Sequence, residues 1–324
     1  MVKYAVRRVS MTKLITNIAD LAAVKESLHL ALGVFDGLHI GHQQVISTAV
    51  EAADKEGGLS GVLTFEPHPI RILAPELAPR RILASLNHKR ELLNDLGVDF
   101  MIVVDFTKEF ADVEAEDFLS SLVAACHDLR TISIGEDWKF GKKRRGDILM
   151  LQHMGKEEGI TIDSSKAVML NGERVSSTRI RQAIRDGNMA AAEAMLGRRY
   201  TVLGEVIKGR QLGRQLGFPT ANLKVFNEQL PIDGVWCVSV TLANGDTING
   251  VGNLGMRPTV EGEQAKRMLE VHLLDFDAEI YGMTMEVEFL DYIRSEQKFS
   301  SVDALSSQIQ LDVIHSREFH ASQH

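Results

Sequence analysis

The spacing of apolar residues changes once along this chain, and the change predicts two domains of different class. Up to about residue 190, apolar runs of strand length alternate with segments of helical periodicity. The runs include LHLALGVF, GVLTF, DFMIVVDF and TISIG. Largely apolar strands of this kind are buried on both faces in parallel sheets covered by crossover helices. We therefore predict a Rossmann-like, doubly wound α/β domain over residues 1–190.

From residue 201 onward, short runs alternate apolar and polar residues, which favours antiparallel strands. The segment ANGDT at residues 243–247 is typical of a hairpin turn. We predict an antiparallel β-barrel over residues 198–324 that ends in a helix, with Val302, Leu305, Ile309 and Val313 on one helical face. The boundary lies near residues 188–200, and a length of 324 residues fits two cores better than one.

Composition and charge restrict the cellular compartment and the classes of partner expected for this protein. The two cysteines, Cys126 and Cys237, lie far apart in apolar runs, which indicates buried thiols rather than a disulfide framework or a zinc site. The N-terminus has no apolar core of a signal peptide, and Met11 could be an alternative start after a disordered leader at residues 1–10. No window reaches the ~18 apolar residues of a membrane span. The net charge of -8 argues against a general nucleic-acid binder, although a local basic pocket stays open. We expect a soluble cytoplasmic protein without nucleic-acid or membrane partners, and a homo-oligomer is left open.

The stretch VFDGLHIGH, residues 34–42, places His39 and His42 three residues apart on a glycine-rich turn from a strand into a helix. Backbone N–H groups and the helix dipole attract anions at such a turn, and imidazoles there can donate hydrogen bonds to phosphate oxygens. A zinc site would need a third ligand, and the spacing is not that of a zincin. The remaining alternative is two histidines near a turn without a function.

A second cluster, NGERVSSTRIRQAIR, brings hydroxyls and arginines to the start of a predicted helix. Ser176, Ser177 and Thr178 could cap the helix or bind phosphate. Arg179 and Arg181 follow at a helix start, where the dipole disfavours cations. The alternatives are a phosphate site and a capped helix with a solvated basic face.

A third stretch, GEVIKGRQLGRQLGFPTANL, combines a glycine-rich loop with PTAN. The loop matches neither a Walker A motif nor a Rossmann fingerprint, and a barrel loop that needs glycines for its turns is an alternative. Thr220 and Asn222 would share one face of an extended segment, and their oxygens suit Mg²⁺. A carboxylate is also needed to help a hydroxyl attack a γ-phosphate, and LEVHLLDFDAEIYG offers Glu270, Asp275, Asp277 and Glu279. Glu270 would share a face with His272, whereas Asp277 and Glu279 are expected to be solvated turn residues.

These motifs together resemble a known family. GVFDGLHIGH, TFEPHP, GEDWKFGKKRRGD and VSSTRIR occur in the order of the adenylyltransferase module of prokaryotic bifunctional riboflavin kinase/FMN adenylyltransferases, or FAD synthetases. GRQLGFPTANL, GVGNLGMRPTVEG and LEVHLLDFDAEIYG resemble the riboflavin kinase module of the same family. The resemblance implies phosphorylation of riboflavin to FMN in the C-terminal module and adenylylation of FMN to FAD in the N-terminal module. It implies riboflavin, FMN, FAD and ATP as ligands, with ATP as co-substrate and Mg²⁺ as the metal.

The resemblance also assigns site residues. The catalytic residues would be His39, His42 and Glu270. The residues that bind ATP or its phosphates would be Gly33, Phe35, Asp36, Gly37, Ser177, Thr178, Arg181, Gly209, Arg214 and Gly217. The flavin-binding residues would be Phe65, Pro67, His68, Asp137, Phe140, Asn253, Arg257 and Arg294, the last either near the flavin or ordering a loop. The Mg²⁺ ligands would be Thr220 and Asn222. The chain departs from the commoner family residues at Lys208, Trp236, Ile293 and His315.

Two other functions stay open on the sequence. A nucleotidylyltransferase with a different small phosphorylated acceptor would share the first motifs, but the PTAN barrel argues against it. A catalytically silent flavin-binding or nucleotide-binding regulator would have lost catalytic groups. His39, His42, Thr220, Asn222 and Glu270 are all present.

Overall fold

The computed structural model of the chain describes residues 11–78, 82–209, 213, 216–226, 229–257 and 266–323. The expected leader at residues 1–10 and the predicted phosphate ligand Arg214 lie outside the described residues, and of Arg257 only the backbone is described. The chain forms two compact units that divide between Ser177 and Thr178, with residues 83–85 grouped with the second. This division precedes the change in apolar spacing near residues 188–200, because two helices before residue 200 group with the second unit. The limits 1–190 and 198–324 for the two activities stay a prediction.

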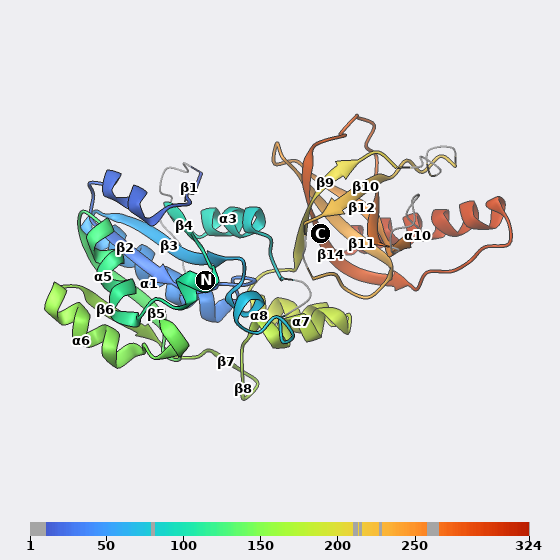
Figure 1. The fold of residues 1–324 in the computed structure, drawn as a ribbon. Coiled ribbons are helices and arrows are strands. Elements are labelled where there is room, and N and C mark those ends of the chain that lie inside the picture. Colours follow the sequence, from blue (N-terminus) through green and yellow to red (C-terminus); the bar gives the residue numbers. More distant parts are fainter. Residues whose placement is uncertain are drawn as a thin grey trace. The chain divides into compact units, whose positions relative to one another are not determined.

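The first unit contains a six-stranded sheet in which every pairing is parallel (Figure 1). In sheet order the strands are β1 (Lys13–Ile15), β4 (Phe100–Asp105), β3 (Leu59–Glu66), β2 (Leu28–Leu32), β5 (Leu129–Gly135) and β6 (Thr161–Ser165). The four apolar runs of the sequence form β2, β3, β4 and β5, as predicted. The chain order reverses between β2 and β5, and sheets of this class bind ligands at such a switch point.

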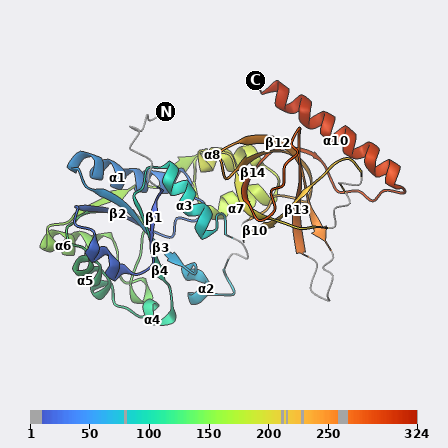
Figure 2. The same cartoon turned by 90° about the horizontal axis from the view of Figure 1, so that it is seen from above.

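Helices cover both faces of this sheet, which confirms the doubly wound prediction. Figure 2 shows α1 and α3 on one side of the sheet and α5 and α6 on the other. The helical elements of this unit are η1 (Ile18–Ala23), α1 (Ile40–Glu56), α2 (Pro69–Leu73), α3 (Leu86–Asp95), α4 (Lys108–Ala111), α5 (Ala115–Ala125), η2 (Lys142–Arg144) and α6 (Ile148–Glu158). Alternate residues of β2, Leu28, Leu30 and Leu32, enter a core that also contains Phe118 and Leu119 of α5. Two short strands, β7 (Met169–Leu170) and β8 (Glu173–Arg174), form a separate hairpin.

The second unit contains the predicted antiparallel barrel, which is closed. Two helices, α7 (Ser177–Arg185) and α8 (Met189–Leu196), precede it. In barrel order its strands are β10 (Ala221–Val225), β13 (Lys266–Leu273), β12 (Thr247–Arg257), β11 (Gly234–Leu242), β14 (Thr284–Arg294) and β9 (Thr201–Ile207). The predicted ANGDT turn joins β11 to β12, where Gly245 has a φ of 89° that favours glycine. Trp236, Val238 and Phe289 are among the buried side chains of the barrel core.

The chain's last segment forms the predicted helix, α10 (Val302–Ser322), which runs along the outside of the barrel (Figure 2). It contacts β11, β12 and β14. Three residues of the predicted apolar face, Leu305, Ile309 and Val313, are half-buried, and Val302 at its start is exposed. The same side of the helix also buries three polar residues, Asp312, Ser316 and His320, which are spaced four residues apart. The reason is that the barrel wall presents an arginine and two backbone carbonyls, which these polar side chains bond.

Candidate active sites

The first site is the turn that joins β2 to α1. Phe35 and Leu38 have φ angles of 49° and 43°, and Gly37 between them has 80°. Left-handed conformations cost about 1–3 kcal/mol at residues other than glycine and persist only where the surroundings fix them. The Phe35 ring lies against Gly33, where a Cβ would be only 2.9 Å from its Cζ, so this position of the ring requires glycine at residue 33. The turn is therefore a rigid structure that holds the start of α1 in one geometry.

The two histidines of this turn form a stacked pair. His39 is the N-cap of α1, and its Nδ1 accepts a hydrogen bond from the backbone N–H of His42 at 3.3 Å. The ring centroids of His39 and His42 are 3.5 Å apart at an interplanar angle of 20°. The Phe35 ring meets His42 edge-on at 5.4 Å. An N-cap histidine that accepts through Nδ1 keeps its Nε2–H as a donor, at a helix end that favours anions.

Both imidazoles are neutral in the ligand-free protein at neutral pH. Burial lowers the pKa of His39 to about 4, although the Asp36 carboxylate opposes this. Burial also lowers the pKa of His42 well below its ordinary value, and repulsion from the His39 ring when it is protonated, from Lys89 and from Arg174 adds to that effect. The Nδ1 of His42 is buried and has no hydrogen-bond partner among the described residues. A phosphate bound here would favour the cationic rings and so raise both pKa values.

Lys89, whose role was not predicted from the sequence, donates a hydrogen bond to the segment that leads into this turn. It lies in α3 with 5% of its surface exposed. Its Nζ donates to the backbone carbonyl of Val34 at 2.9 Å and to Oγ1 of Thr64 at 3.1 Å. Thr64 Oγ1 also donates to the same Val34 carbonyl at 2.9 Å. Burial lowers the pKa of Lys89, whereas the carboxylates of Asp36 and Glu66 raise it. The sequence feature that could have indicated a role for Lys89 is its position on the apolar face of a predicted helix.

The VSST element reaches the same turn. Ser177, the first residue of α7, donates its hydroxyl hydrogen bond to the backbone carbonyl of Asp36 at 2.9 Å, across 141 residues of sequence. Asp36 itself is 4% exposed. Thr178 and Arg181 lie in the first turns of α7, and Arg181 is buried. The structure thus joins the first and the last motif of the predicted adenylyltransferase site through Ser177.

The FEPHP residues lie at the carboxyl end of β3 and have structural partners. The Phe65 ring is 8% exposed and meets Phe106 at 5.7 Å. Pro67 follows a cis peptide bond. His68 caps α2, because its Nδ1 accepts from the backbone N–H of Ile70 at 3.3 Å. These contacts are compatible with the turn and packing roles of such residues, and their flavin contacts stay predictions.

The GEDWKFGKKRRGD residues lie at the carboxyl end of β5. Asp137 forms an ion pair of 2.7 Å with Arg174, which lowers the pKa of that carboxyl group. Phe140 is 6% exposed and stacks on Trp138 with ring centroids 4.7 Å apart. Phe140 is therefore a core residue of the ligand-free protein, and Asp137 is the more accessible of the two. Their assignment to the flavin or nucleotide stays a prediction.

The second site is a row of polar residues across three neighbouring barrel strands. The strand register places Asn222 of β10 opposite Glu270 of β13, and Glu270 opposite Asn253 of β12. The flanking residues of β13, Leu269 and Val271, are fully buried, so Glu270 faces the outside of the barrel wall. Side chains directly opposite each other have Cβ atoms about 4.5–5.5 Å apart. Two amides and one carboxylate are therefore brought together from three separate motifs.

The glycine-rich loop lies against this row. A Cβ at Gly209 would lie 2.5 Å from Cγ of Asn222, so the loop backbone approaches the amide as closely as only glycine allows. A Cβ at Gly213 would overlap the backbone carbonyl oxygen of Phe218, and it would also lie 3.4 Å from Oγ1 of Thr220. Gly217 has a φ of 84°. These contacts explain three glycines of the loop and place it beside the predicted metal ligands.

His272 anchors the segment that leads into PTAN. Its Nδ1 hydrogen-bonds the backbone carbonyl of Pro219 at 2.8 Å, and its ring meets Phe218 edge-on at 5.7 Å. His272 lies two residues after Glu270 and shares its face. The shared face was predicted, but this contact with Pro219 was not.

The donor set of this row fits Mg²⁺. The buried amide oxygen Oδ1 of Asn253 has no hydrogen-bond partner among the described residues. A buried unsatisfied oxygen is costly unless a ligand or water completes it. The amides of Asn222 and Asn253 with the hydroxyl of Thr220 offer the uncharged oxygens that Mg²⁺ accepts beside substrate phosphates.

Arg294 orders the end of the chain. Its Nε and terminal nitrogen donate to both carboxylate oxygens of Asp312 in α10, at 2.8 and 2.7 Å. Its guanidinium also lies 5.7 Å from the centre of the Phe299 ring. Of the two roles expected for Arg294, the ordering of a segment is the one with visible contacts, and the flavin contact stays a prediction.

Trp236 and Lys208, two residues that depart from the commoner family residues, contact other parts of the barrel unit. Trp236 is 1% exposed in the barrel core, and its indole N–H donates to the carbonyl of Ile232 at 3.2 Å. The Lys208 ammonium lies 5.8 Å from the centre of the Tyr281 ring. Neither residue belongs to the Asn222–Glu270–Asn253 row.

Comparisons with known proteins follow the same division. The model of the FAD synthetase family matches residues 21–179, and that of the riboflavin kinase family matches residues 196–320. The bifunctional riboflavin kinase/FMN adenylyltransferase of Escherichia coli K12 is 39% identical over 95% of this chain and 97% of its own length. The protein of the same name from Listeria monocytogenes is 38% identical over 90% of this chain and 92% of its own.

One solved structure is similar over almost the whole chain. It is a crystal structure described as a macrolide-efflux protein from Streptococcus pneumoniae, with a TM-score of 0.79 and 32% identity. The similarity covers 95% of this chain and 99% of that one. In the described part of the present chain, none of the helices combines the length and the apolar character needed to cross a membrane.

Proposed function

This chain belongs to the bifunctional riboflavin kinase/FMN adenylyltransferase family, and from that premise we propose how its residues perform the two reactions. It phosphorylates riboflavin with ATP to give FMN, and it adenylylates FMN with a second ATP to give FAD and pyrophosphate. The proposed mechanism depends on one observation, which is that a single chain contains two separate groups of residues suited to binding phosphates. These are the stacked histidines before α1 and the Asn222–Glu270–Asn253 row of the barrel.

Adenylyl transfer takes place at the β2–α1 turn. The ATP phosphates bind at the start of α1, where His39 and His42 donate hydrogen bonds to oxygens that gain charge as the α-phosphorus changes partners. Ser177, Thr178 and Arg181 bind the phosphates from the second motif. The FMN phosphate attacks the α-phosphorus in line, and pyrophosphate leaves. The attacking phosphate is already an anion, so this step requires no general base and no covalent enzyme intermediate.

Phosphoryl transfer takes place at the barrel row. The nucleophile is the neutral 5′-hydroxyl of the ribityl chain, so a base is needed, and Glu270 accepts its proton as the oxygen attacks the γ-phosphorus. Thr220 and Asn222 would hold Mg²⁺, which neutralises charge on the ATP phosphates. Gly209 lets the loop backbone approach the Asn222 side chain closely, and His272 keeps the entry to β10 in place. ADP leaves after the transfer.

For the flavins we propose the residues that form each pocket but not their individual contacts. Phe65, Pro67, His68, Asp137 and Phe140 surround the carboxyl ends of β3 and β5 and would shape the FMN pocket of the first unit. What supports this proposal is that all five residues lie at the same edge of the sheet. In the barrel, Asn253, Arg257 and Arg294 would border the riboflavin. The two free cysteines support a cytoplasmic location.

The test is direct. The purified chain is incubated with riboflavin, ATP and Mg²⁺, and FMN and FAD are followed by chromatography. FMN should appear first and FAD afterwards, and EDTA should stop the production of FMN. A protein that binds riboflavin without forming either product would be the silent regulator. A protein that consumes ATP but adenylylates a phosphorylated acceptor other than FMN would be the other alternative.

A further inference from the structure

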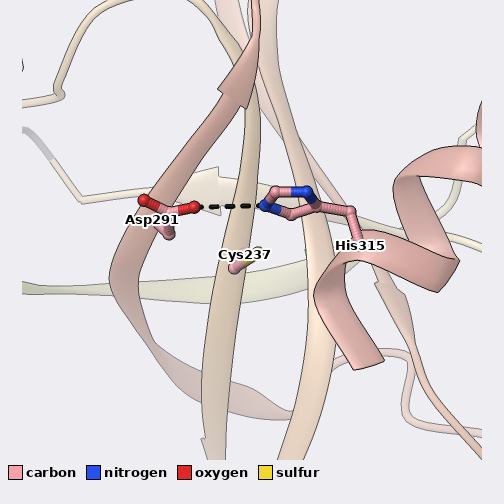
Figure 3. A group of neighbouring side chains, drawn as sticks. All are labelled: Cys237, Asp291 and His315. Carbon is pink, nitrogen blue, oxygen red and sulfur yellow. Dashed lines mark hydrogen bonds and ion pairs between the residues drawn. The ribbon is translucent and has the colours of Figure 1, made fainter. Parts of the chain in front are cut away.

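Three metal-ligating side chains, none of which belongs to the Asn222–Glu270–Asn253 row, meet on the outer wall of the barrel (Figure 3). Cys237 lies in β11, Asp291 in β14 and His315 in α10. The Cys237 Sγ, a carboxylate oxygen of Asp291 and a ring nitrogen of His315 all lie within 4.8 Å of one another. Among these separations, His315 Nε2 lies 3.2 Å from Asp291 Oδ2. We call Cys237, Asp291 and His315 the barrel-wall cluster.

The fold holds the three backbones in place without an ion. Cys237 and Asp291 are opposite each other in the antiparallel pair of β11 and β14, next to a register shift between Cys237 and Val238. The helix turn that carries His315 is fixed by its neighbour Ser316, which is buried and donates its hydroxyl hydrogen bond to the carbonyl of Gly250 at 3.0 Å. Preorganised backbones reduce the ordering cost of binding a ligand.

We propose that the barrel-wall cluster is a binding site for a transition-metal dication, with zinc as the preferred ion. A thiolate, an imidazole and a carboxylate are all ordinary zinc ligands. The thiolate separates this site from Mg²⁺ and Ca²⁺ sites, which are built from oxygens. Three protein ligands leave a fourth position of a tetrahedral ion for water. The side chains of Asp291 and His315 are 44% and 49% exposed, so an ion can reach these two ligands from solvent, whereas Cys237 is buried.

Binding replaces one bond by another at the thiol. The Cys237 S–H proton passes to solvent as the bond between Sγ and the metal forms, while the imidazole and the carboxylate bind through lone pairs. Without an ion, burial raises the pKa of the Cys237 thiol to about 11, so the cluster alone is not a nucleophile. The bound ion would connect β11, β14 and α10 by direct bonds and so stabilise the attachment of the terminal helix.

Cobalt provides a direct readout, because Co²⁺ bound to a thiolate has a charge-transfer absorption that oxygen ligands do not give. The full chain is stripped with EDTA and titrated with Co²⁺. We expect this band to saturate at one ion per chain and to disappear when Zn²⁺ is added. The chain has two cysteines. Cys237→Ala should abolish the band, and the matched control Cys126→Ala should retain it.

A second pair of variants tests the imidazole. His315→Ala should weaken Co²⁺ binding more than about 100-fold, since even the outer partners of metal ligands affect affinity 10–100-fold. The control is His153→Ala, which removes another exposed histidine, paired at 3.6 Å with Glu157. Zn²⁺ should raise the thermal unfolding midpoint of the unaltered chain and of His153→Ala, but not that of His315→Ala. FMN and FAD formation by His315→Ala should be unchanged.

Three results would overturn the proposal. They are the absence of a thiolate band at stoichiometric Co²⁺, a band that survives Cys237→Ala, and equal affinities of His315→Ala and the unaltered chain. Binding of Co²⁺ through oxygens alone would belong to the Mg²⁺ site and would also count against the barrel-wall cluster. Since His315 is half-exposed, its replacement keeps the test valid even if Cys237→Ala fails to fold.

Discussion

Gly209→Ala should disable the kinase reaction through a single steric overlap. The added Cβ would lie 2.5 Å from Cγ of Asn222, about 0.9 Å below the 3.4 Å at which ordinary contact begins. Gly209 does not require a left-handed backbone, so this overlap is the main effect of the substitution. The Asn222 amide, which lies opposite Glu270 in the strand pair, must move by roughly that amount. A misplacement of about 1 Å can cost about 100-fold in rate, which corresponds to about 2.7 kcal/mol of transition-state stabilisation.

The assay measures kcat/KM for riboflavin phosphorylation in Gly209→Ala, Asn222→Ala and the double variant. Once Asn222 is truncated, the overlap with its Cγ disappears, and Gly209→Ala should then cost less than about threefold. That coupling of about 2 kcal/mol lies within the range of residues in contact. Gly135→Ala is the control for the kinase reaction, because Gly135 has no left-handed φ and a Cβ there would make only an ordinary contact, 3.5 Å from Oδ1 of Asp137. Additive effects of Gly209→Ala and Asn222→Ala would refute the reasoning, and so would an equal loss of FMN adenylylation.

Three further predictions concern the first site. The folded-state pKa of His39 is about 4 because of burial, below the ordinary 6.5, so the unfolded chain takes up the proton first as the pH falls. Its contribution to the free energy of unfolding is therefore intact above pH 6.5 and decreases by up to about 3 kcal/mol towards pH 4; denaturant unfolding at both pH values should show a smaller decrease in His39→Gln. Lys89→Met removes the donor to the Val34 carbonyl and should lower the rate of FAD formation from FMN about 10–100-fold; FMN formation measured in the same samples should not change, and an unaltered rate of adenylylation would exclude a positioning role for Lys89. Gly33→Ala pushes the Phe35 ring away from its edge-on contact with the histidine pair and should lower adenylylation at least about 10-fold; unchanged chromatographic rates would show that this ring does not fix the pair.

Much of the fold is local enough to be predicted from the sequence. The central strands have long apolar runs, and α1 has helical spacing that ends at Gly57, which adopts a left-handed φ of 75°. The edge strands β1 and β6 were missed. In β6 the residues Thr161–Ser165 are mostly polar and only partly buried, so no apolar run marks them. Their pairing with the sheet is a tertiary effect.

The sites were predictable as motifs but not as arrangements. The sequence places Thr220 and Asn222 on one face, but the meeting of Asn222, Glu270 and Asn253 depends on the register of three strands. A shift of one residue would move Glu270 into the core. Residue chemistry suggested roles for Asn222 and Glu270, but only the motif resemblance gave Asn253 a role before the register was known.

Buried polar residues were the least predictable part. Lys89 lies on the apolar face of α3, where sequence patterning alone expects a hydrophobic side chain. In α10 the predicted face was confirmed by the half-buried Leu305, Ile309 and Val313, but the polar residues buried on the same side were not predicted. The barrel-wall cluster joins residues 237, 291 and 315, whose separations match no compact metal-binding spacing. Each of these features depends on partners far away in the sequence.

The central claim is that two separate groups of residues perform the two reactions, and one paired measurement tests it most directly. The double variant His39→Ala/His42→Ala and the single variant Glu270→Gln are each incubated with ATP and Mg²⁺, once with riboflavin and once with FMN. The double variant should convert riboflavin to FMN and then stop, while Glu270→Gln should lose about 10²–10⁴-fold in phosphorylation yet still convert supplied FMN to FAD. Equal loss of both reactions in both folded variants would contradict the account.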